Sequence, residues 1–544
     1  MLKSVQSPLL ALVWRFLIFC LFCNGAIGTR DEYFLSVTGL ENLLNIEIVM
    51  LDQLQHYVDS IQSHINMLQS EVNSIRLEHS IAAEDIDGYL SNPINAYRLI
   101  KRLQNDWSII EESIRIEPSR TDFFVRMEKN RQSYDFPTKE DVTGSAMGLV
   151  RLQDTYKIEV GELASGILNG NKYGSSMSWQ DCFYIGQHLY EINNFNHTIE
   201  WMKQSEELLK KQEKTDDPYV LDVMETIVAY YQGIGDLDNA LELVDYILSI
   251  DASRGEIANL KLTLEHMIRD GNKTGLMYEL PPQAGDYHLT EDFKRYEQVC
   301  RGELLLTPAE QRILKCRFVS NNVPYRLLQP FKVEEISLDP PILQIHGVLS
   351  EDDTNLIKDL SKTRVSRSVV RSADGFDDSA VDYRISKSAW FAYNETRQFG
   401  KIQRCMKDLS LLNMESAEQF QVTNYGIGGH YEPHFDFFIE NQTYTEGNRI
   451  ATGIFYLSEV EEGGGTAFPH LRVLVKPEHG SVLFWYNLHR SGEPDFRTRH
   501  AACPVLKGSK WIGNIWVRER HQSLERPCEL EPDHEISLKY KYFQ

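Results

Sequence analysis

The stretch Phe420-Gln-Val-Thr-Asn-Tyr-Gly-Ile-Gly-Gly-His-Tyr-Glu-Pro-His-Phe-Asp436 combines a strand pattern, a turn and two potential metal ligands. Its first residues include aromatic and β-branched types, which favour β-strands, and its glycines predict a tight turn. Similar runs follow at residues 450–457 and 481–486, with a second glycine cluster at residues 463–465. Many short strands separated by turn signals predict a jelly-roll or barrel for the C-terminal part of the chain.

His434 and Asp436 are the chemical centre of this stretch. Residues two apart on a strand point to the same face, so the imidazole and the carboxylate can bind one metal ion. His500 is the candidate third ligand, and two histidines with one carboxylate form the facial triad of non-haem Fe(II) oxygenases. The pair alone is weak evidence, because sixteen histidines would give about one His-X-Asp pair by chance.

Lys510 follows ten residues after His500, beside Trp511 and before an apolar alternation that favours burial. In an iron oxygenase, an ammonium near the metal would bind the distal carboxylate of a 2-oxo acid. A hydroxyl from Tyr425 or Thr466 could complete that contact. A single lysine is more often a solvated surface charge, so this interpretation rests on its surroundings.

The N-terminal region, residues 29–115, has a helical pattern. Apolar residues recur at alternating steps of three and four, without glycine or proline, at Leu51, Leu54, Val58, Ile61, Ile65, Leu68, Val72 and Ile75. This seam favours a coiled coil with a second copy of the chain. A long amphipathic helix packed on its own domain is the alternative.

Residues 178–255 show a second helical style. Two segments, which begin near Trp179 and Leu221, each contain a tyrosine-rich helix, a turn and another helix, as in tetratricopeptide-like pairs. Such tyrosines are usually core residues, although a groove of flat rings would also fit the polyproline II helix of a proline-rich peptide. The candidates for that groove are Tyr190, Tyr230 and Tyr231.

The first 28 residues have the pattern of a secretory signal peptide, with Lys3 and Arg15 before an apolar run and a small-residue site. Eight cysteines, six of them beyond this segment, and four N-glycosylation sequons fit an oxidising compartment. No later run approaches the roughly 18 apolar residues of a membrane span. The formal charge of −23, from 56 basic and 79 acidic residues, argues against nucleic-acid binding.

Longer motifs follow one another along the chain. The first motif is the part of the opening stretch from Asn424 to Asp436. It is followed by Gly447-Asn-Arg-Ile-Ala-Thr452, Gly463-Gly-Gly-Thr-Ala-Phe-Pro469, Phe484-Trp-Tyr-Asn-Leu488 and Thr498-Arg-His-Ala-Ala-Cys-Pro-Val-Leu506. Less specific segments precede them at Asn92-Pro93, Leu99-Ile-Lys-Arg-Leu-Gln104, Cys300-Arg-Gly-Glu303 and Tyr383-Arg-Ile-Ser-Lys-Ser-Ala-Trp390. Together these motifs resemble the catalytic alpha subunit of collagen prolyl 4-hydroxylase, a 2-oxoglutarate- and Fe(II)-dependent dioxygenase. The resemblance covers nearly the whole chain.

The resemblance implies a role for each matching residue. The iron ligands would be His434, Asp436 and His500, and the residues for 2-oxoglutarate would be Lys510, Tyr425 and Thr466. The family usually has a histidine where this chain has Arg518, so we expect Arg518 to contact the cofactor. Because arginine does not change its protonation near neutral pH, cofactor handling could differ from that of the family.

The resemblance also implies disulfides and partners. The cysteine pairs would be Cys300 with Cys316 and Cys503 with Cys528, while Cys182 and Cys405 have no assigned state. The family works in the lumen of the endoplasmic reticulum, as two alpha subunits with two copies of protein disulfide isomerase, the beta subunit. We therefore expect an α2β2 heterotetramer that self-associates through the N-terminal helices.

These patterns predict a multidomain α+β protein that is helical first and β last. The expected order is a signal peptide (1–28), a helical coiled-coil dimerisation domain (29–140), a tetratricopeptide-like peptide-substrate domain (141–255), a linker with a disulfide (256–335), a double-stranded β-helix (jelly-roll) catalytic domain (336–528) and a C-terminal tail (529–544).

The expected activity is 4-hydroxylation of proline in X-Pro-Gly repeats of collagen-like chains. Oxygen and 2-oxoglutarate would be consumed, with succinate as a product, and ascorbate would rescue iron oxidised in uncoupled turnovers. One alternative is a non-catalytic or weakly active collagen-binding relative. Another is a secretory-pathway peptidyl hydroxylase with a different substrate. A third, a zinc hydrolase with the same three ligands, lacks an evident general base.

Overall fold

The computed structural model describes residues 62, 65–115, 139–211, 218–269, 287–368, 370–371, 378–379, 383–426, 428–438 and 445–530. The expected signal peptide, the start of the coiled-coil seam and most of the C-terminal tail lie outside the described residues. By its contacts, the chain divides into two units, residues 1–80 and residues 81–544. No helix in the described ranges is long and apolar enough to cross a lipid bilayer.

The described part of the N-terminal seam is helical from residue 65 to residue 84. Ile65 is 50% exposed and Val72 is 41% exposed, while Leu68 and Ile75 are half-buried. The spacing therefore predicts the helix correctly. Its apolar seam is only partly covered by the described residues of a single chain.

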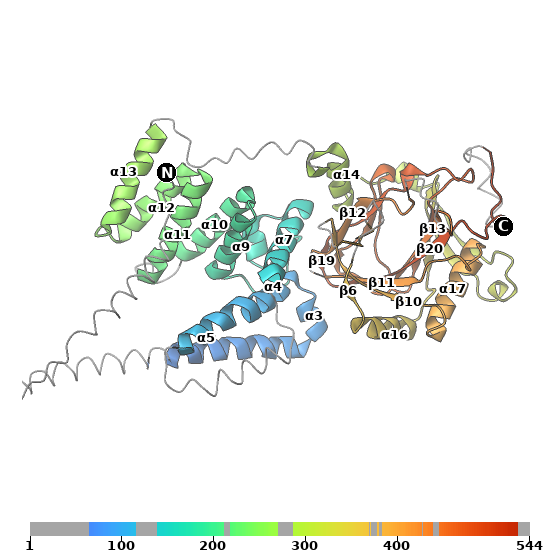
Figure 1. The fold of residues 1–544 in the computed structure, drawn as a ribbon, viewed down its shortest axis with the longest axis horizontal. Helices are drawn as coiled ribbons and strands as arrows, with labels where there is room; N and C mark the ends of the chain where they lie inside the picture. The colour runs from blue at the N-terminus through green and yellow to red at the C-terminus, as the bar shows by residue number, and fades with distance from the viewer. Residues whose placement is uncertain are drawn as a thin grey trace, which may run out of the picture. The chain divides into compact units, whose positions relative to one another are not determined.

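The helical part of the second unit is drawn from blue to green in Figure 1. It begins with α3 (Ile86–Leu90), α4 (Pro93–Lys101), a π-helical turn (Arg102–Asp106), α5 (Trp107–Arg115), α7 (Lys139–Tyr156) and α8 (Val160–Ala164). After the hairpin of β1 (Ile167–Leu168) and β2 (Asn171–Lys172) come α9 (Trp179–Glu191), α10 (Phe195–Lys210), α11 (Pro218–Ile234), α12 (Leu237–Ile250) and α13 (Gly255–Arg269). Consecutive helices from α9 to α13 contact one another.

Two apolar cores hold these helices together. The first joins Tyr97 of α4, Leu149 of α7 and Trp201 of α10, so the N-terminal helices share a core with the start of the tetratricopeptide-like array. The second includes Ile257 and Leu264 of α13. Because these two side chains are buried and α13 packs on α12, the array continues to the end of α13. The expected domain boundary at residue 255 is therefore wrong.

The β-rich part consists of two main antiparallel sheets. The large sheet has the order β3 (Cys316–Val319), β4 (Phe331–Leu338), β5 (Pro341–His346), β17 (Val482–Tyr486), β13 (Arg449–Tyr456), β20 (Lys510–Arg518), β11 (Phe420–Tyr425), β10 (Lys387–Phe391) and β6 (Ser366–Arg367). The smaller sheet has the order β16 (Val473–Val475), β15 (Thr466–Phe468), β18 (His500–Ala502), β12 (His430–His434) and β9 (Arg384–Ile385). Two short ladders pair β7 (Val370–Arg371) with β8 (Asp378–Ser379), and β14 (Glu462–Gly463) with β19 (Val505–Lys507).

The β-rich part begins earlier in the chain than expected. Strand β3 pairs with β4 along its whole length, so the large sheet starts at Cys316 and the expected boundary at residue 336 is wrong. In the described residues, the α-helices that accompany the sheets are α14 (Glu291–Cys300), α15 (Pro308–Gln311), α16 (Glu351–Lys362) and α17 (Arg397–Ser410). The fold class is confirmed: helices come first, and a β-rich double-sheet domain follows.

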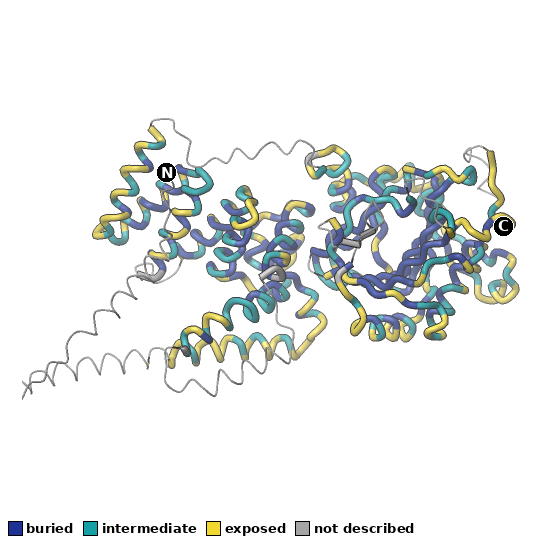
Figure 2. Tube along the Cα trace, viewed as in Figure 1, coloured by how far each residue is buried: buried dark blue, intermediate teal, exposed yellow. Residues whose placement is uncertain are grey.

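Alternation along the strands sorts side chains between two cores, because successive strand residues point to opposite faces. On β20, Ile515 and Val517 join a core with Ile357 of α16 and Phe399 of α17. Ile512 points the other way, into the core between the two sheets. Figure 2 shows these strands as mostly buried. The face of β20 that includes Ile512 points toward the smaller sheet, and this face also lines the cavity described below.

The predicted disulfide pairing is wrong. Cys300, at the end of α14, is bonded to Cys503, just after β18, with an S–S distance of 2.01 Å. Helix α14 packs on β15 and β16 of the smaller sheet, which brings Cys300 to Cys503, whereas Cys316 lies on the edge strand of the large sheet. The other cysteines of the described chain are free: Cys182 and Cys405 are buried, and Cys316 and Cys528 are exposed.

Candidate active site

His434, Asp436 and His500 meet where β12 and β18 run side by side. His434 and His500 are direct cross-strand partners. The Nε2 atom of His434 lies 3.7 Å from Oδ1 of Asp436, and Nε2 of His500 lies 3.6 Å from Oδ2. One ligand atom from each residue lies within 4.8 Å of the other two. Two imidazoles and one carboxylate at this spacing fit a single Fe(II) ion.

Backbone carbonyl groups orient both imidazoles. Nδ1 of His434 lies 2.8 Å from the carbonyl oxygen of Glu432. Nδ1 of His500 lies 3.0 Å from the carbonyl oxygen of Thr498. When Nδ1–H donates to these oxygens, the Nε2 lone pair of each ring is free to bind the metal.

A buried hydrogen-bond chain holds the carboxylate of Asp436. Its Oδ2 accepts a hydrogen bond of 2.8 Å from Thr452, whose hydroxyl accepts one of 2.8 Å from Asn487. Burial opposes the charge, but the neighbouring His500 and His434 hold the pKa of Asp436 below its usual range. Burial, and then His500, lowers the pKa of His434 to about 3. Carboxylate and neutral imidazole are the forms that bind metal.

A buried lysine lies on another side of the same cavity. Lys510 is 1% exposed, which confirms the predicted burial, and burial lowers its pKa to about 7. Its Nζ lies 3.5 Å from the carbonyl oxygen of Gly465 and 5.5 Å from the ring centre of Tyr425. Thr466 and Tyr456 share a buried hydrogen bond of 2.8 Å. Among the ion pairs of the described chain, none involves Lys510, so its charge is not compensated by a carboxylate.

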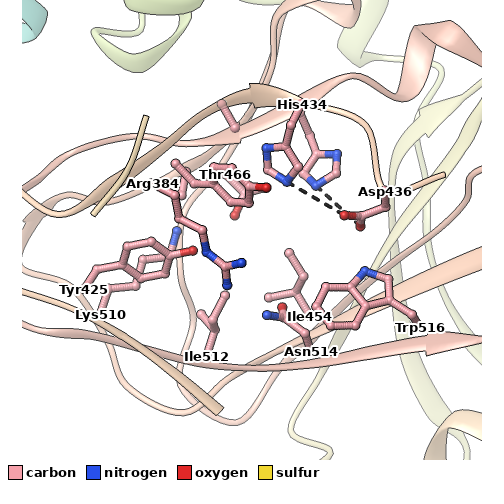
Figure 3. A pocket seen from close by; sticks show the side chains of 14 residues that line it. Arg384, Tyr425, His434, Asp436, Ile454, Thr466, Lys510, Ile512, Asn514 and Trp516 are labelled. Carbon is pink, nitrogen blue, oxygen red and sulfur yellow. Dashed lines mark ion pairs between the residues drawn. The ribbon is translucent and has the colours of Figure 1, made fainter. Parts of the chain in front are cut away.

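Figure 3 shows His434 and Asp436 on one side of the cavity and Lys510 and Tyr425 on the other. The lining residues are Arg384, Tyr425, Tyr431, His434, Asp436, Ile454, Thr466, His500, Ala501, Ala502, Lys510, Ile512, Asn514 and Trp516. Every second residue of β20 from Lys510 to Trp516 belongs to this lining. Strand alternation therefore carries the lysine and the indole to the same wall.

Several lining residues have no role in the sequence analysis, and three of them carry aromatic or charged side chains: Tyr431, Arg384 and Trp516. Tyr431 stacks on His434 with ring centres 3.5 Å apart, and the Arg384 guanidinium lies 4.9 Å from the Tyr431 ring. Nε1 of Trp516 is buried and has no hydrogen-bond partner in the part of the chain that the structure describes. The alternation along β20 predicts Trp516 once Lys510 is placed. The alternation along β20 cannot predict Arg384, because Arg384 lies on a different strand, β9.

The structure does not place Arg518 in the cavity. Its Nη1 donates to Oε1 of Glu418 over 3.2 Å, and its guanidinium lies 4.9 Å from the ring centre of Phe438. Arg449 donates to both oxygens of the same carboxylate, over 2.6 and 2.7 Å. Arg518 is not among the lining residues. The cofactor contact of Arg518 stays a prediction; in this structure the Glu418 carboxylate binds its guanidinium at the end of β20.

The structure separates the three tyrosines predicted for a peptide groove. Tyr231 is 0% exposed and donates to Glu206 over 3.0 Å, so its predicted groove position is wrong. Tyr190 and Tyr230 are half-buried, with ring centres 5.0 Å apart. Further ring contacts extend this pair into an aromatic row, which consists of Tyr184, Phe183, Tyr230, Tyr190 and Phe195.

Comparison with known proteins decides the family. Over 531 residues the chain is 36% identical to "Prolyl 4-hydroxylase subunit alpha-2" of Gallus gallus, and the match covers 95% of this chain and 98% of that protein. The chain belongs to the prolyl 4-hydroxylase alpha-subunit family. "Prolyl 4-hydroxylase subunit alpha-1" of Homo sapiens is 36% identical over 540 residues, covering 95% of this chain and 99% of that protein.

Three family descriptions match successive parts of the chain. They are "Prolyl 4-Hydroxylase alpha-subunit, N-terminal region" at residues 36–170, "Prolyl 4-hydroxylase peptide-substrate-binding domain" at residues 179–270 and "2OG-Fe(II) oxygenase superfamily" at residues 420–518. The last range contains the three clustered ligands. The chain is therefore a 2-oxoglutarate- and Fe(II)-dependent prolyl 4-hydroxylase alpha subunit, and His434, Asp436 and His500 are its iron-binding triad.

Solved structures match about a third of the chain. A viral collagen prolyl hydroxylase from Paramecium Bursaria Chlorella virus-1 is 26% identical, with a TM-score of 0.28, and the match covers 32% of this chain and 95% of that one. A prolyl-4-hydroxylase of Pseudomonas putida is 16% identical, with a TM-score of 0.25, over 33% of this chain and 92% of that one.

Proposed function

We propose that this chain hydroxylates C4 of proline in X-Pro-Gly repeats of collagen-like chains. One oxygen atom of O2 enters the proline, and the other enters succinate as 2-oxoglutarate loses carbon dioxide. The observation that supports this most is a single cavity with the iron-binding triad on one side and the uncompensated Lys510 on another. A facial triad leaves open positions on the metal for the co-substrate and oxygen.

Lys510 would bind the distal carboxylate of 2-oxoglutarate. Its ammonium is buried without an acid partner, and an anionic ligand would compensate that charge. The Thr466 hydroxyl is oriented by Tyr456, and the Tyr425 hydroxyl is in the same lining; both would donate to the carboxylate. Bound Fe(II) supplies the redox chemistry, while these side chains orient the co-substrate and exclude water.

Trp516 would contact the peptide. Trp516 lines the cavity, and its Nε1–H is a buried donor without a partner in the described ranges. A buried donor without an acceptor is unfavourable, and a carbonyl oxygen of the substrate backbone would satisfy it. This favours a peptide as the second substrate.

The aromatic row of the helical domain would bind the proline-rich chain outside the cavity. Tyr190 and Tyr230 are half-buried and pack edge to face with an interplanar angle of 71°. Aromatic rings that line a groove suit the polyproline II helix, which is already extended before binding. Tyr231 is excluded from this role by its burial.

The alpha subunit would work in the lumen of the endoplasmic reticulum with protein disulfide isomerase as beta subunit, in an α2β2 assembly. The Cys300–Cys503 bond supports an oxidising compartment. The partly exposed seam around Ile65 and Val72 supports self-association through the region 29–140. Ascorbate would return iron to Fe(II) after uncoupled turnovers.

One experiment tests the proposed activity. The chain, produced with protein disulfide isomerase, is incubated with a (Pro-Pro-Gly)-type peptide, Fe(II), ascorbate and labelled 2-oxoglutarate. Mass spectrometry measures hydroxyproline, and the label measures succinate. Wild type should form both, with at least one succinate for each hydroxyproline, and His434→Ala should form neither. His470→Ala, which removes a more exposed histidine outside the triad, should behave as wild type. Equal activity in wild type and His434→Ala, or no hydroxyproline from either, would overturn the proposal.

A further inference from the structure

A buried lysine of the N-terminal helices lies against the aromatic row. Lys101 is the last residue of α4, and its side chain is 7% exposed. Its Nζ lies 5.0 Å from the ring centre of Tyr184, which forms one end of the row. A cation over an aromatic face is attracted by the ring quadrupole, more strongly where water is excluded. A residue outside the matched peptide-binding range, 179–270, thus reaches the row.

Two carboxylates hold the Lys101 ammonium in place. Nζ lies 3.1 Å from Oδ1 of Asp181 and 3.2 Å from Oδ1 of Asp106. The other oxygen of Asp181 accepts from the backbone N–H and the hydroxyl of Ser178, over 2.8 Å each, and so caps α9. The position of the ammonium is therefore tied to the first turn of α9, the helix that carries Tyr184.

The π-helical turn explains why Asp106 can reach Lys101. These residues are five apart, which is about 1.4 turns of an α-helix, so in a regular helix they would point in different directions. Residues 102–106 form a π-helical turn, whose wider i to i+5 pattern returns Asp106 to the side of Lys101. π-Turns are rare and occur frequently at functional sites.

We propose that Lys101 is a positioning residue for the peptide substrate. Held by Asp181 and Asp106, its ammonium fixes the Tyr184 end of the aromatic row and so sets the affinity of the row for a proline-rich chain. This inference rests on the proposed peptide-binding role of the row. The N-terminal helices then contribute to substrate specificity, although Lys101 itself is buried and does not touch the peptide.

Steady-state kinetics of the full assembly with a (Pro-Pro-Gly)-type peptide test this role. Lys101→Met should raise the peptide KM about fivefold to tenfold with kcat unchanged, because a Tyr184 side chain that the cation no longer holds must be ordered when the peptide binds. Lys101→Arg keeps the cation and should restore most of the affinity. Lys210→Met is the matched control, because Lys210 lies 4.7 Å from the Tyr246 ring and pairs with Glu206, outside the row. Its KM should equal that of wild type.

A double-mutant cycle separates positioning from general loss of structure. Tyr184→Leu removes the ring that the cation holds and should raise KM by a similar factor. Because both changes remove the same contact, the double variant should be no worse than either single variant. Additive effects would overturn the proposal. If Lys101→Met does not fold, an unchanged KM in Tyr184→Leu overturns it.

A further variant distinguishes this proposal from the function on which it rests. Replacement of both Tyr190 and Tyr230 by alanine should raise KM more than Lys101→Met does. If that double variant leaves KM unchanged, the proposed peptide groove is wrong. If it raises KM while Lys101→Met and Tyr184→Leu do not, the groove stands and only the role of Lys101 is overturned.

Discussion

Two buried lysines of this chain have opposite environments. Lys101 in the helical domain is held by Asp181 and Asp106, which raise its pKa against the effect of burial. Lys510 in the barrel is more deeply buried and has no carboxylate partner, so burial lowers its pKa to about 7. Both lysines lie near an aromatic ring, at 5.0 and 5.5 Å from its centre. The difference lies in the acids around them.

The presence or absence of an acid partner distinguishes a buried charge that stabilises the fold from a buried charge that binds a ligand. A buried ion pair whose hydrogen bonds are complete serves the fold, and loss of one partner leaves an uncompensated charge. A buried cation without an acid is unfavourable in the free protein and becomes favourable only when an anion binds. Lys510 is of the second kind, in agreement with an anionic co-substrate in the same cavity.

The largest effect is expected from Lys510→Met. Succinate formation at a fixed, subsaturating 2-oxoglutarate concentration should fall about 100-fold, because a charge-assisted contact to the carboxylate is lost. The thermal unfolding midpoint of the free protein should stay the same or rise, since an uncompensated buried cation is removed. Steady-state kinetics measure succinate formation, and calorimetry on the same preparation measures the unfolding midpoint. A clear drop in the midpoint would mean that Lys510 serves the fold instead.

Lys101→Met should show the reverse pattern. The free energy of unfolding of the helical part should fall by about 3 kcal/mol, because the buried Asp181 carboxylate loses its cation. The double variant with Asp181→Asn removes both charges and should recover part of this loss. Denaturant unfolding followed by circular dichroism measures the difference. Equal stability of wild type and Lys101→Met would contradict the structural assignment of this pair.

The pH dependence should also separate the two lysines. In the free folded protein Lys510 loses its proton near pH 7, while an unfolded lysine keeps it to about pH 10.4. Between these values the unfolded chain binds more protons, so the contribution of Lys510 to folding stability rises with pH. The affinity for 2-oxoglutarate should fall as pH rises through the same window, because the protonated form binds the anion.

Titration calorimetry from pH 6 to pH 9 measures that affinity. Lys101, whose pKa is raised by its acids, stays charged throughout this range. Lys101→Met should therefore leave the pH profile of 2-oxoglutarate binding unchanged. A profile that is flat in wild type would show that Lys510 does not titrate near neutral pH.

The smallest effect is expected from Arg518→His. The Glu418 carboxylate keeps both hydrogen bonds from Arg449 in this variant, and Arg518 does not line the cavity. We expect less than a threefold change in kcat and in the KM for 2-oxoglutarate, about 0.6 kcal/mol or less. A tenfold change in either constant would show that Arg518 contacts the cofactor.

Local periodicity explains what could be predicted from the sequence. His434 and Asp436 are two residues apart on an extended segment, so their shared face follows from the strand repeat alone. The alternation after Lys510 likewise predicted a buried wall, and Lys510 is 1% exposed. The three-and-four spacing before residue 84 predicted a helix, and the described part is helical.

Long-range packing decided the rest. Tyr230 and Tyr231 are adjacent, yet one is half-buried in the aromatic row and the other is fully buried against Glu206, because helix rotation sends neighbours to different faces. Cys300 bonds Cys503, although Cys316 is far closer along the chain, because α14 packs on the smaller sheet.

The sequence by itself determined the order of the domains, the face that carries the metal ligands and the family. Only the tertiary structure decided which charges are compensated. Lys101 and Asp181 are 80 residues apart, and Arg518 and Glu418 are 100 apart. The physical reason is that a strand or helix repeat acts over a few residues, whereas the partner of a buried charge is set by how distant elements pack. Such partners hold Lys101 in one position against the aromatic row, and their absence leaves Lys510 free to bind an anion.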